Sequence, residues 1–317
     1  MPRSESKIVF GLTDAALIAM TVIWGLDFIV IKTTLSEISP FAFMAGRFVI
    51  AGTLLVLVVK WRQGGFGIPR ADWGKVALLG IVGTTIYQPL FLNGLALTKA
   101  SNSALILAST PAFIVLLNRF IRGERFTLRG WVGIALSFLG ITLIVFSSGD
   151  LTLDSSALLG DVFILAATIL WSLYSVLSAP LLKRYSSLSL TALSTLFGTI
   201  PLVILSIPAL LAQPWPSVSP GGWSGLLYSA IFAIVVAYVI WNIGVQRIGG
   251  ARTAMYNNLT PVIATLAATV FLSESLTVLK IAGAIVIFVG LYLARTANVV
   301  VSTNEKRINE WGTFGSE

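Results

Sequence analysis

The sequence predicts an all-α polytopic membrane protein in which ten transmembrane helices form two inverted five-helix repeats, with both termini on the cytoplasmic side. Three observations predict this fold class: an apolar composition, an asymmetric distribution of basic residues, and an internal repeat. Of the 317 residues, 56% are hydrophobic and 11% are charged, whereas a soluble domain carries about 25% charged residues. Together with a mean hydropathy of +0.91, this composition excludes a soluble globular protein.

Ten apolar runs are long enough to cross a bilayer, which takes about 20 residues of helix. They cover residues 12–32, 41–60, 74–94, 101–120, 127–147, 161–182, 189–211, 224–244, 252–272 and 277–295. The first run contains Asp14 and Asp27 and lacks a small-residue cleavage site. We therefore interpret it as a retained helix and not as a signal peptide.

Basic residues indicate the orientation of these runs. With the N-terminus inside, 17 of the 21 Lys and Arg residues lie on the cytoplasmic side, while Lys32, Lys99 and Lys280 lie outside and Arg47 lies within a span. Basic residues concentrate on the cytoplasmic side of membrane proteins. We therefore expect both termini in the cytoplasm, and we interpret the basic residues as topology and lipid-surface determinants, not as a nucleic-acid site.

The internal repeat divides the chain into two copies. An offset of 150 residues aligns Trp73 with Trp223, Thr110-Pro111 with Thr260-Pro261, and Glu124 with Glu274; an offset of 147 aligns Asp14 with Asp161 and Trp24 with Trp171. Each copy holds five spans, an odd number, so the second copy enters the membrane upside down. We expect repeats over 8–147 and 160–296 and a polar cytoplasmic tail over 297–317. Inverted repeats are typical of secondary transporters, although a duplication kept for packing alone is the alternative.

Pro111 and Pro261 lie near mid-span in equivalent helices. Proline removes a backbone hydrogen bond, which here leaves the carbonyl groups of Leu107 and Asn257 without their usual helical partners. A static kink accounts for either proline alone. The symmetric pair favours helix bending during function.

Two blocks carry a family resemblance: STPAFIVLLNRFIRGERFTLRGWVGIALSFLGI from Ser109 and LTPVIATLAATVFLSESLTVLKIAGAIVIFVGL from Leu259. Each resembles the second half of an EamA repeat of the drug/metabolite transporter superfamily, and WGLDFIVIK and PFAFMAGRFVIAG resemble the first two helices of such a repeat. The resemblance covers residues 8 to 296. It implies ten helices around a central cavity and the export or exchange of small metabolites. Within the superfamily, the chain is most similar to the YddG-type amino-acid exporters of bacteria.

Asp27 and Arg47 are the charged residues deep within their spans, and they lie at similar depth on the first two helices. An isolated charge at the centre of a membrane costs at least about 2.5–3.5 kcal/mol, so we expect the two to pair. Two roles are open: a positioning salt bridge with no part in transport, or a substrate or proton role for Asp27.

Polar and aromatic residues within the spans are candidates for the substrate pathway. They are Trp24, Tyr87, Gln88, Trp171, Tyr174, Tyr238, Trp241, Asn242, Tyr256, Asn257 and Asn258. Amides both donate and accept hydrogen bonds, and aromatic faces suit an apolar side chain or a cation. The alternative is that the amides join helices.

Glu124 and Glu274 each lie three residues before a Thr that begins the next helix. For both we expect a stabilising position at a helix N-terminus rather than a coupling role.

The chain has no Cys and no His, so thiol nucleophiles, imidazole bases and thiolate or imidazole metal sites are excluded. We expect no enzyme, no metal and no cofactor, and no GxxxxGK[ST] motif indicates an ATPase module. The expected partners are a small-molecule substrate and the lipid bilayer, while the sequence leaves the oligomeric state open. We expect a carrier of the bacterial inner membrane that exports amino acids, including aromatic and neutral ones, by alternating access. An exporter of other metabolites or drugs and a channel-like facilitator are the alternatives.

Overall fold

The computed structural model describes residues 11–122, 127–146 and 155–296. The regular structure in these ranges is helical throughout, without a strand, which confirms the all-α prediction. Glu124 and the tail over 297–317 lie outside the described residues.

The helices follow one another with short connections. The first half of the chain contains α1 (Leu12–Thr34), α2 (Pro40–Gln63), η1 (Arg70–Asp72), α3 (Trp73–Gly80), η2 (Ile81–Ile86), α4 (Tyr87–Leu97), α5 (Ala100–Leu107), α6 (Thr110–Arg122) and α7 (Leu128–Phe146). The second half contains α8 (Ser155–Leu182), α9 (Ser187–Ala212), η3 (Trp215–Ser217), α10 (Pro220–Tyr228), η4 (Ser229–Val236), α11 (Ala237–Ile248), α12 (Gly250–Tyr256), α13 (Leu259–Phe271) and α14 (Val278–Thr296).

Seven helical stretches of the described residues are long and apolar enough to cross a membrane. They are Leu12–Thr34, Pro40–Gln63, Arg70–Leu97, Ala100–Ile121, Ser156–Leu182, Ser187–Ala212 and Pro220–Ile248. Leu128–Ile144 and Val278–Gly290 are shorter apolar helices, and the predicted span 252–272 is divided between α12 and α13. Ten crossings therefore remain an expectation.

The helix interruptions coincide with the two Thr-Pro pairs. α5 ends at Leu107 and α6 begins at Thr110, while α12 ends at Tyr256 and α13 begins at Leu259. The carbonyl of Leu107 accepts a hydrogen bond from the Thr110 hydroxyl at 2.6 Å. At the equivalent position the carbonyl of Asn257 accepts from the Thr260 backbone amide at 3.0 Å. The threonine before each proline thus supplies a donor for the carbonyl that lacks its usual helical partner.

Two further irregularities lie at matching places. η2 and η4 are π-helical segments in which the backbone is wider than in an α-helix, and an offset of 150 residues brings Ile81–Ile86 onto 231–236, within η4. Such segments are rare and frequently occur at functional sites. Within η2, Gly83 lies against the ring of Tyr174, and a Cβ added to this glycine would lie 2.5 Å from Cδ2 of the ring.

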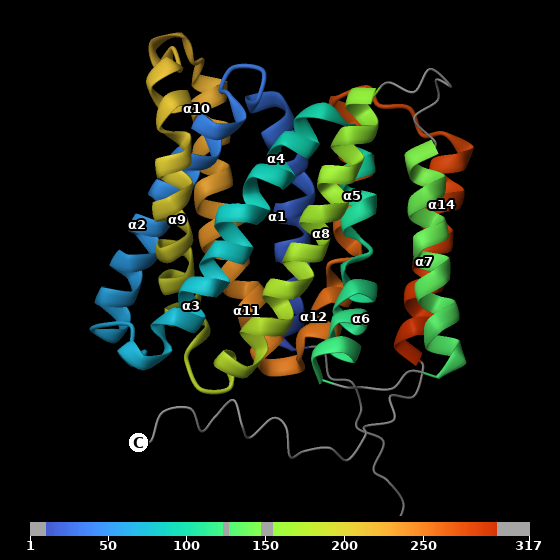
Figure 1. Cartoon of the computed structure of the whole chain (residues 1–317). Coiled ribbons are helices and arrows are strands. Elements are labelled where there is room, and N and C mark those ends of the chain that lie inside the picture. The colour runs from blue at the N-terminus through green and yellow to red at the C-terminus, as the bar shows by residue number, and fades with distance from the viewer. Residues whose placement is uncertain (1–10, 123–126, 147–154, 297–317) are drawn as a thin grey trace, which may run out of the picture.

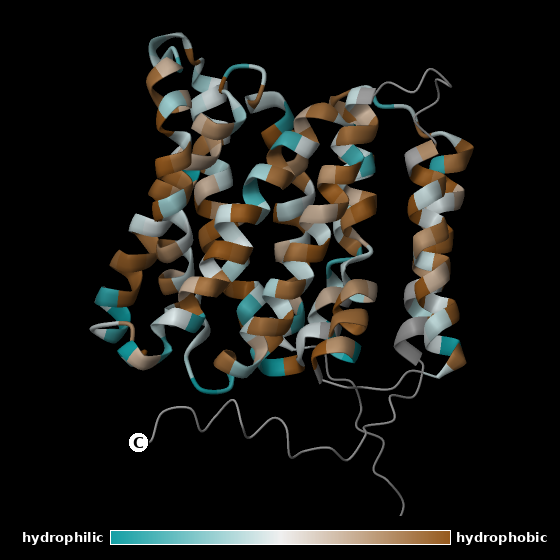
Figure 2. Cartoon of the chain, viewed as in Figure 1, coloured by the Kyte–Doolittle hydropathy of each residue, from teal (hydrophilic) through white to brown (hydrophobic). Residues whose placement is uncertain are grey.

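The helices stand side by side in one bundle, and α7 packs against α14 at its edge (Figure 1). A Cβ added at Gly140 would lie 2.6 Å from the carbonyl oxygen of Gly283, and one added at Gly290 would lie 2.6 Å from that of Gly133. These glycines therefore let two helices of the same chain approach closely. Hydrophobic residues run along the middle of the bundle, and hydrophilic residues gather towards its ends (Figure 2), as expected for helices in a bilayer.

We call the end of the bundle with connections 35–39, 98–99 and 272–277 the upper end, as it is drawn in Figure 1. Here Glu274 lies at a helix N-terminus, but the helix is not the one that follows it. Its carboxylate accepts hydrogen bonds from the backbone amides of Ala100 at 2.9 Å and Ser101 at 3.2 Å, at the start of α5, and from the Ser101 hydroxyl. The hydroxyl of Thr277 accepts from the Lys280 amide at 3.2 Å at the start of α14. Glu274 therefore joins α5 to the α13–α14 connection.

Candidate functional site

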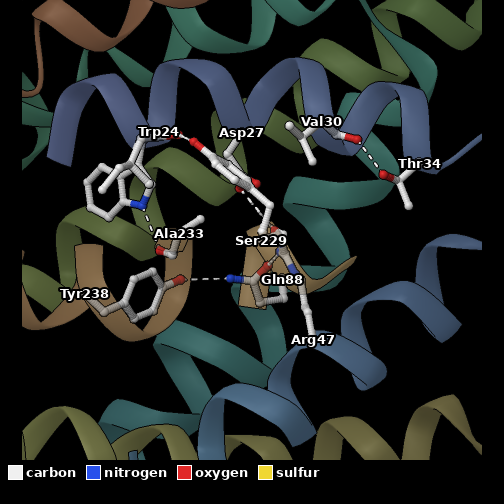
Figure 3. A network of polar contacts seen from close by, with 11 residues as sticks. Trp24, Asp27, Val30, Thr34, Arg47, Gln88, Ser229, Ala233 and Tyr238 are labelled. Atoms are coloured by element: carbon white, nitrogen blue, oxygen red, sulfur yellow. Dashed lines mark hydrogen bonds and ion pairs between the residues drawn. The ribbon is translucent and has the colours of Figure 1, made fainter. Parts of the chain in front are cut away.

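A buried polar network crosses the centre of the bundle (Figure 3). Arg47 on α2, which is 2% exposed, places Nη1 3.8 Å from Oδ2 of Asp27 on α1. The same Nη1 donates to the Ser229 hydroxyl at 2.8 Å, and this hydroxyl donates to Asp27 Oδ2 at 3.3 Å. On the other side, Nη2 of Arg47 donates to the side-chain oxygen of Gln88, whose nitrogen donates to the hydroxyl of Tyr238 at 2.9 Å. The two charges are thus brought together, with Ser229 between them.

Two atoms of this network have no hydrogen-bond partner among the described residues. They are Oδ1 of Asp27 and Nε of Arg47, and both are buried. Leaving a buried polar atom unsatisfied costs about 1–3 kcal/mol, and more when the group is charged. The hydrogen bonding of the pair is therefore incomplete, and each of the two charged groups has one atom that can make a further hydrogen bond.

Aromatic rings form a cluster beside the network. Trp171 is the central ring, with centroid distances of 5.1–5.8 Å to Trp24, Tyr87, Tyr174, Tyr238 and Trp241. Trp24 donates its indole N–H to the carbonyl of Ala233, within η4, at 2.9 Å. The cluster thus joins α1, α4, α8 and α11 across the middle of the bundle, and it offers apolar faces beside a charged pair.

A cavity of about 60 Å³ lies where the network and the rings meet. A water molecule needs about 10–15 Å³ by this measure, so the cavity has room for a few water molecules in this conformation. It is lined by Trp24, Asp27, Phe28, Arg47, Tyr87, Gln88, Phe91, Ala104, Leu107, Ala108, Trp171, Ala233, Ile234, Tyr238, Asn257, Thr260 and Pro261. The lining therefore contains one carboxylate, one guanidinium and a largely apolar remainder.

Several residues predicted from the sequence lie outside this lining. Asn242 donates to the Tyr174 hydroxyl at 3.0 Å and to Thr191 at 2.7 Å. Trp241 is fully buried, and its indole N–H has no partner in the part of the chain that the structure describes. Tyr256 donates to the Asp14 carboxylate near the start of α1. The other predicted residues outside the lining are Tyr174, Asn258 and Pro111. The amide of Asn242 joins helices, which was the alternative interpretation.

Other lining residues carried no strong sequence signal. Phe91 lies four residues after Tyr87, one helical turn away, and the two rings stack at 5.6 Å, so helical spacing could have found it. Ala104 lies on α5 and Ala108 directly follows the end of this helix, and neither has a polar side chain to single it out. Ser229, which bridges the charged pair but is not among the lining residues, belongs to the π-helical segment η4 and is one of many buried hydroxyls. Among the described residues no group of three or more Asp, Glu, His or Cys side chains gathers into a metal site.

Comparisons with known proteins identify a family and a fold. The sequence model of the EamA-like transporter family matches twice, over residues 11–146 and 158–296. An uncharacterized transporter of Archaeoglobus fulgidus is 33% identical over 87% of this chain and 95% of that protein. A protein of Salmonella typhimurium named "Probable amino-acid metabolite efflux pump" is 27% identical over 86% of this chain and 91% of that protein. The uncharacterized transporter YyaM of Bacillus subtilis is 27% identical over 88% of this chain and 92% of that protein. A solved crystal structure with 22% identity covers 90% of this chain and 97% of that chain with a TM-score of 0.62, which shows a shared fold.

Proposed function

The chain belongs to the EamA-like transporter family, and from this premise we propose that it is a secondary carrier that exports small metabolites, with amino acids as its substrate class. Transport proceeds by alternating access around the cavity lined by Asp27, Arg47 and Trp171. The observation that carries this proposal is a buried charged pair with unsatisfied atoms beside an aromatic cavity at the centre of a membrane protein. Ionisable residues within spans mark substrate or ion pathways in membrane proteins.

Contacts at the cavity support the two inverted repeats. Trp24 contacts Trp171, and Gln88 donates to Tyr238; in each pair the two residues are at equivalent positions of the predicted repeats, 147 and 150 residues apart. Equivalent positions of two halves related by a two-fold axis meet only near that axis. The two separate matches to the family model support the same division. A site on the axis is accessible from either side when the halves rock.

The topology follows from this division. We propose ten crossings in which α5–α6 and α12–α13 each form one interrupted span, with the upper end facing outward and both termini in the cytoplasm of a bacterial inner membrane. The excess of Lys and Arg at the lower end supports this orientation. The Thr-Pro interruptions at Pro111 and Pro261 provide bending points, because a helix break leaves fewer backbone hydrogen bonds to disrupt.

The amino-acid assignment is supported by the name of the Salmonella relative and by the chemistry of the cavity. Asp27 and Arg47 present opposite charges, and the rings of Trp24 and Trp171 provide an apolar surface. Tyr256 and Asn258, which lie outside the cavity in this conformation, are proposed to line the pathway between the cavity and the cytoplasm.

Counterflow in liposomes tests the proposal. Purified protein is reconstituted into liposomes loaded with an unlabelled amino acid at millimolar concentration, and trace labelled amino acid is added outside at equal pH. A carrier accumulates the label inside transiently above its equilibrium level. The reason is that the abundant unlabelled solute inside the liposome competes with the label for the inward-facing binding site and so slows its exit. A channel lets the label equilibrate without this overshoot. If Phe, Trp, Met and Thr all fail in protein shown to be folded, the amino-acid assignment is wrong, and other small metabolites are then tested.

A further inference from the structure

We propose that Asp27 and Arg47 form a head-group site for a zwitterionic α-amino acid with an apolar side chain, in which Oδ1 of Asp27 accepts from the ammonium group and Nε of Arg47 donates to the carboxylate. This inference rests on the proposed carrier function. It adds the residues that select the substrate and the charge pattern that they require. It also separates α-amino acids from anionic, cationic and uncharged metabolites.

The first argument is that Asp27 and Arg47 leave part of each other's hydrogen-bonding capacity unused. A purely structural pair would be expected to make direct, parallel hydrogen bonds between guanidinium and carboxylate. Here the closest contact is 3.8 Å, and the Ser229 hydroxyl bridges the two groups. Oδ1 of Asp27 and Nε of Arg47 have no hydrogen-bond partner within residues 11–122, 127–146 and 155–296, although both side chains are at least nine-tenths buried. One acceptor and one donor are thus free beside the same cavity.

The second argument concerns net charge. Among the described lining residues, Asp27 and Arg47 are the only Asp, Glu, Lys or Arg side chains; the other titratable groups that line the cavity are the hydroxyls of Tyr87 and Tyr238. The lining is therefore neutral overall. A zwitterion keeps the occupied site neutral, whereas a cation or an anion adds an uncompensated charge to a low-dielectric environment. The cavity consequently favours a ligand that carries both charges.

The third argument is the apolar part of the cavity lining. Phe28 and Phe91 lie on α1 and α4 with ring centroids 5.7 Å apart, and Phe91 stacks on Tyr87. Together with Trp171 they form an apolar surface within the same cavity. When the cavity widens during the transport cycle beyond its present volume of about 60 Å³, an aromatic or large aliphatic side chain buries its area against these rings, while its α-carbon carries the two charges towards Asp27 and Arg47.

A set of ligands that differ only at the head group tests this assignment in the wild-type protein. Phenylalanine carries both charges, 2-phenylethylamine lacks the carboxylate, and 3-phenylpropionate lacks the ammonium. Binding is measured from the shift of the thermal unfolding midpoint of the purified full chain in detergent, and from competition in the counterflow assay. We expect both analogues to bind at least tenfold more weakly than phenylalanine, because each leaves one buried partner unsatisfied and adds net charge.

A variant then assigns the ammonium to Asp27. Asp27→Asn should reduce the preference for phenylalanine over 3-phenylpropionate at least tenfold, since the amide no longer favours an ammonium group. Asp161→Asn is the matched control. Asp161 is also a buried carboxylate, 3% exposed, but it accepts a hydrogen bond from Thr98 at 2.7 Å and does not line the cavity. In this control the preference for phenylalanine over 3-phenylpropionate should remain unchanged.

The outcomes separate the two proposals. If phenylalanine shows counterflow but both analogues compete within threefold of it, the head-group site is refuted while the carrier remains. The same follows if Asp27→Asn folds and retains the full preference. If no amino acid binds or shows counterflow, both the amino-acid assignment and the head-group site are wrong. The wild-type ligand series decides the case even if Asp27→Asn does not fold.

Discussion

Neutralising both members of the charged pair should cost less free energy of unfolding than the sum of the costs of neutralising each member alone. Arg47→Gln leaves the Asp27 carboxylate buried without its cation, and Asp27→Asn leaves the Arg47 guanidinium buried without its anion. The double variant Asp27→Asn/Arg47→Gln contains two neutral amides that can hydrogen-bond with each other and with Ser229. The three variants and the wild type form a double-mutant cycle.

The magnitude follows from the geometry. At the observed 3.8 Å between Arg47 Nη1 and Asp27 Oδ2, an effective dielectric constant of 20 gives a Coulomb attraction of about 4 kcal/mol. Arg47 also donates to Ser229 and Gln88, and hydrogen bonds to charged groups contribute about 1.5–3 kcal/mol each. Breaking one side of a buried pair costs about 3–5 kcal/mol. We therefore expect about that loss for each single variant, and a double variant that loses about 1–3 kcal/mol less than the sum of the two.

Reversible unfolding in mixed micelles, followed by fluorescence of the nine Trp residues, measures the free energy of unfolding of all four proteins. Asp161→Asn serves as a control for the loss of a buried carboxylate outside the network. A coupling free energy below about 0.5 kcal/mol would show that the two sites are independent. That result would refute the reasoning that Asp27 and Arg47 stabilise each other across α1 and α2.

Two further predictions concern helix packing. Glu274→Gln should lower the free energy of unfolding by about 1.5–3 kcal/mol. The amide replaces a carboxylate that accepts hydrogen bonds from two backbone amides at the start of α5 and from the Ser101 hydroxyl. Chemical unfolding of the two proteins measures this difference. Gly83→Ala should cost about 1–3 kcal/mol through overpacking, because the new Cβ would lie 2.5 Å from the Tyr174 ring, whereas Gly74→Ala meets no atom within 4 Å and should not destabilise.

Each of these has a clear contrary result. A Glu274→Gln protein as stable as the wild type would mean that the carboxylate contributes nothing beyond a neutral acceptor. Equal stability of Gly83→Ala and Gly74→Ala would mean that the ring of Tyr174 moves aside freely. In that case the π-helical segment η2 does not depend on close contact at Gly83.

Much of the architecture could be predicted because it depends on properties that are local along the chain. Run length and hydropathy predict where helices lie, and the repeat offset predicts that irregularities recur, as the interruptions before Pro111 and Pro261 do. Residue spacing at 1.5 Å per residue also predicts depth along a helix. For this reason the similar depth of Asp27 and Arg47 follows from their positions in the sequence alone.

The partners of individual side chains could not be predicted in the same way. Glu274 was expected at a helix N-terminus, but its position at the start of α5 depends on how a distant connection packs. Asn242 and Asn257 are both buried amides, yet only Asn257 lines the cavity. Pro261 marks the backbone carbonyl of Asn257 in the sequence, but no sequence feature indicates which of the two amide side chains reaches the cavity, because that depends on how the surrounding helices pack.

The sequence by itself determined the membrane class, the predicted spans, the expected orientation and the need to shelter two charges, because each depends on composition, charge and position along the chain. Only the tertiary structure decided that Ser229 bridges Asp27 and Arg47, that one atom of each has no partner among the described residues, and that Phe28 and Phe91 line the same cavity. Such features arise between helices far apart in sequence. Their geometry is set by packing, which brings particular faces together and leaves others towards the lipid.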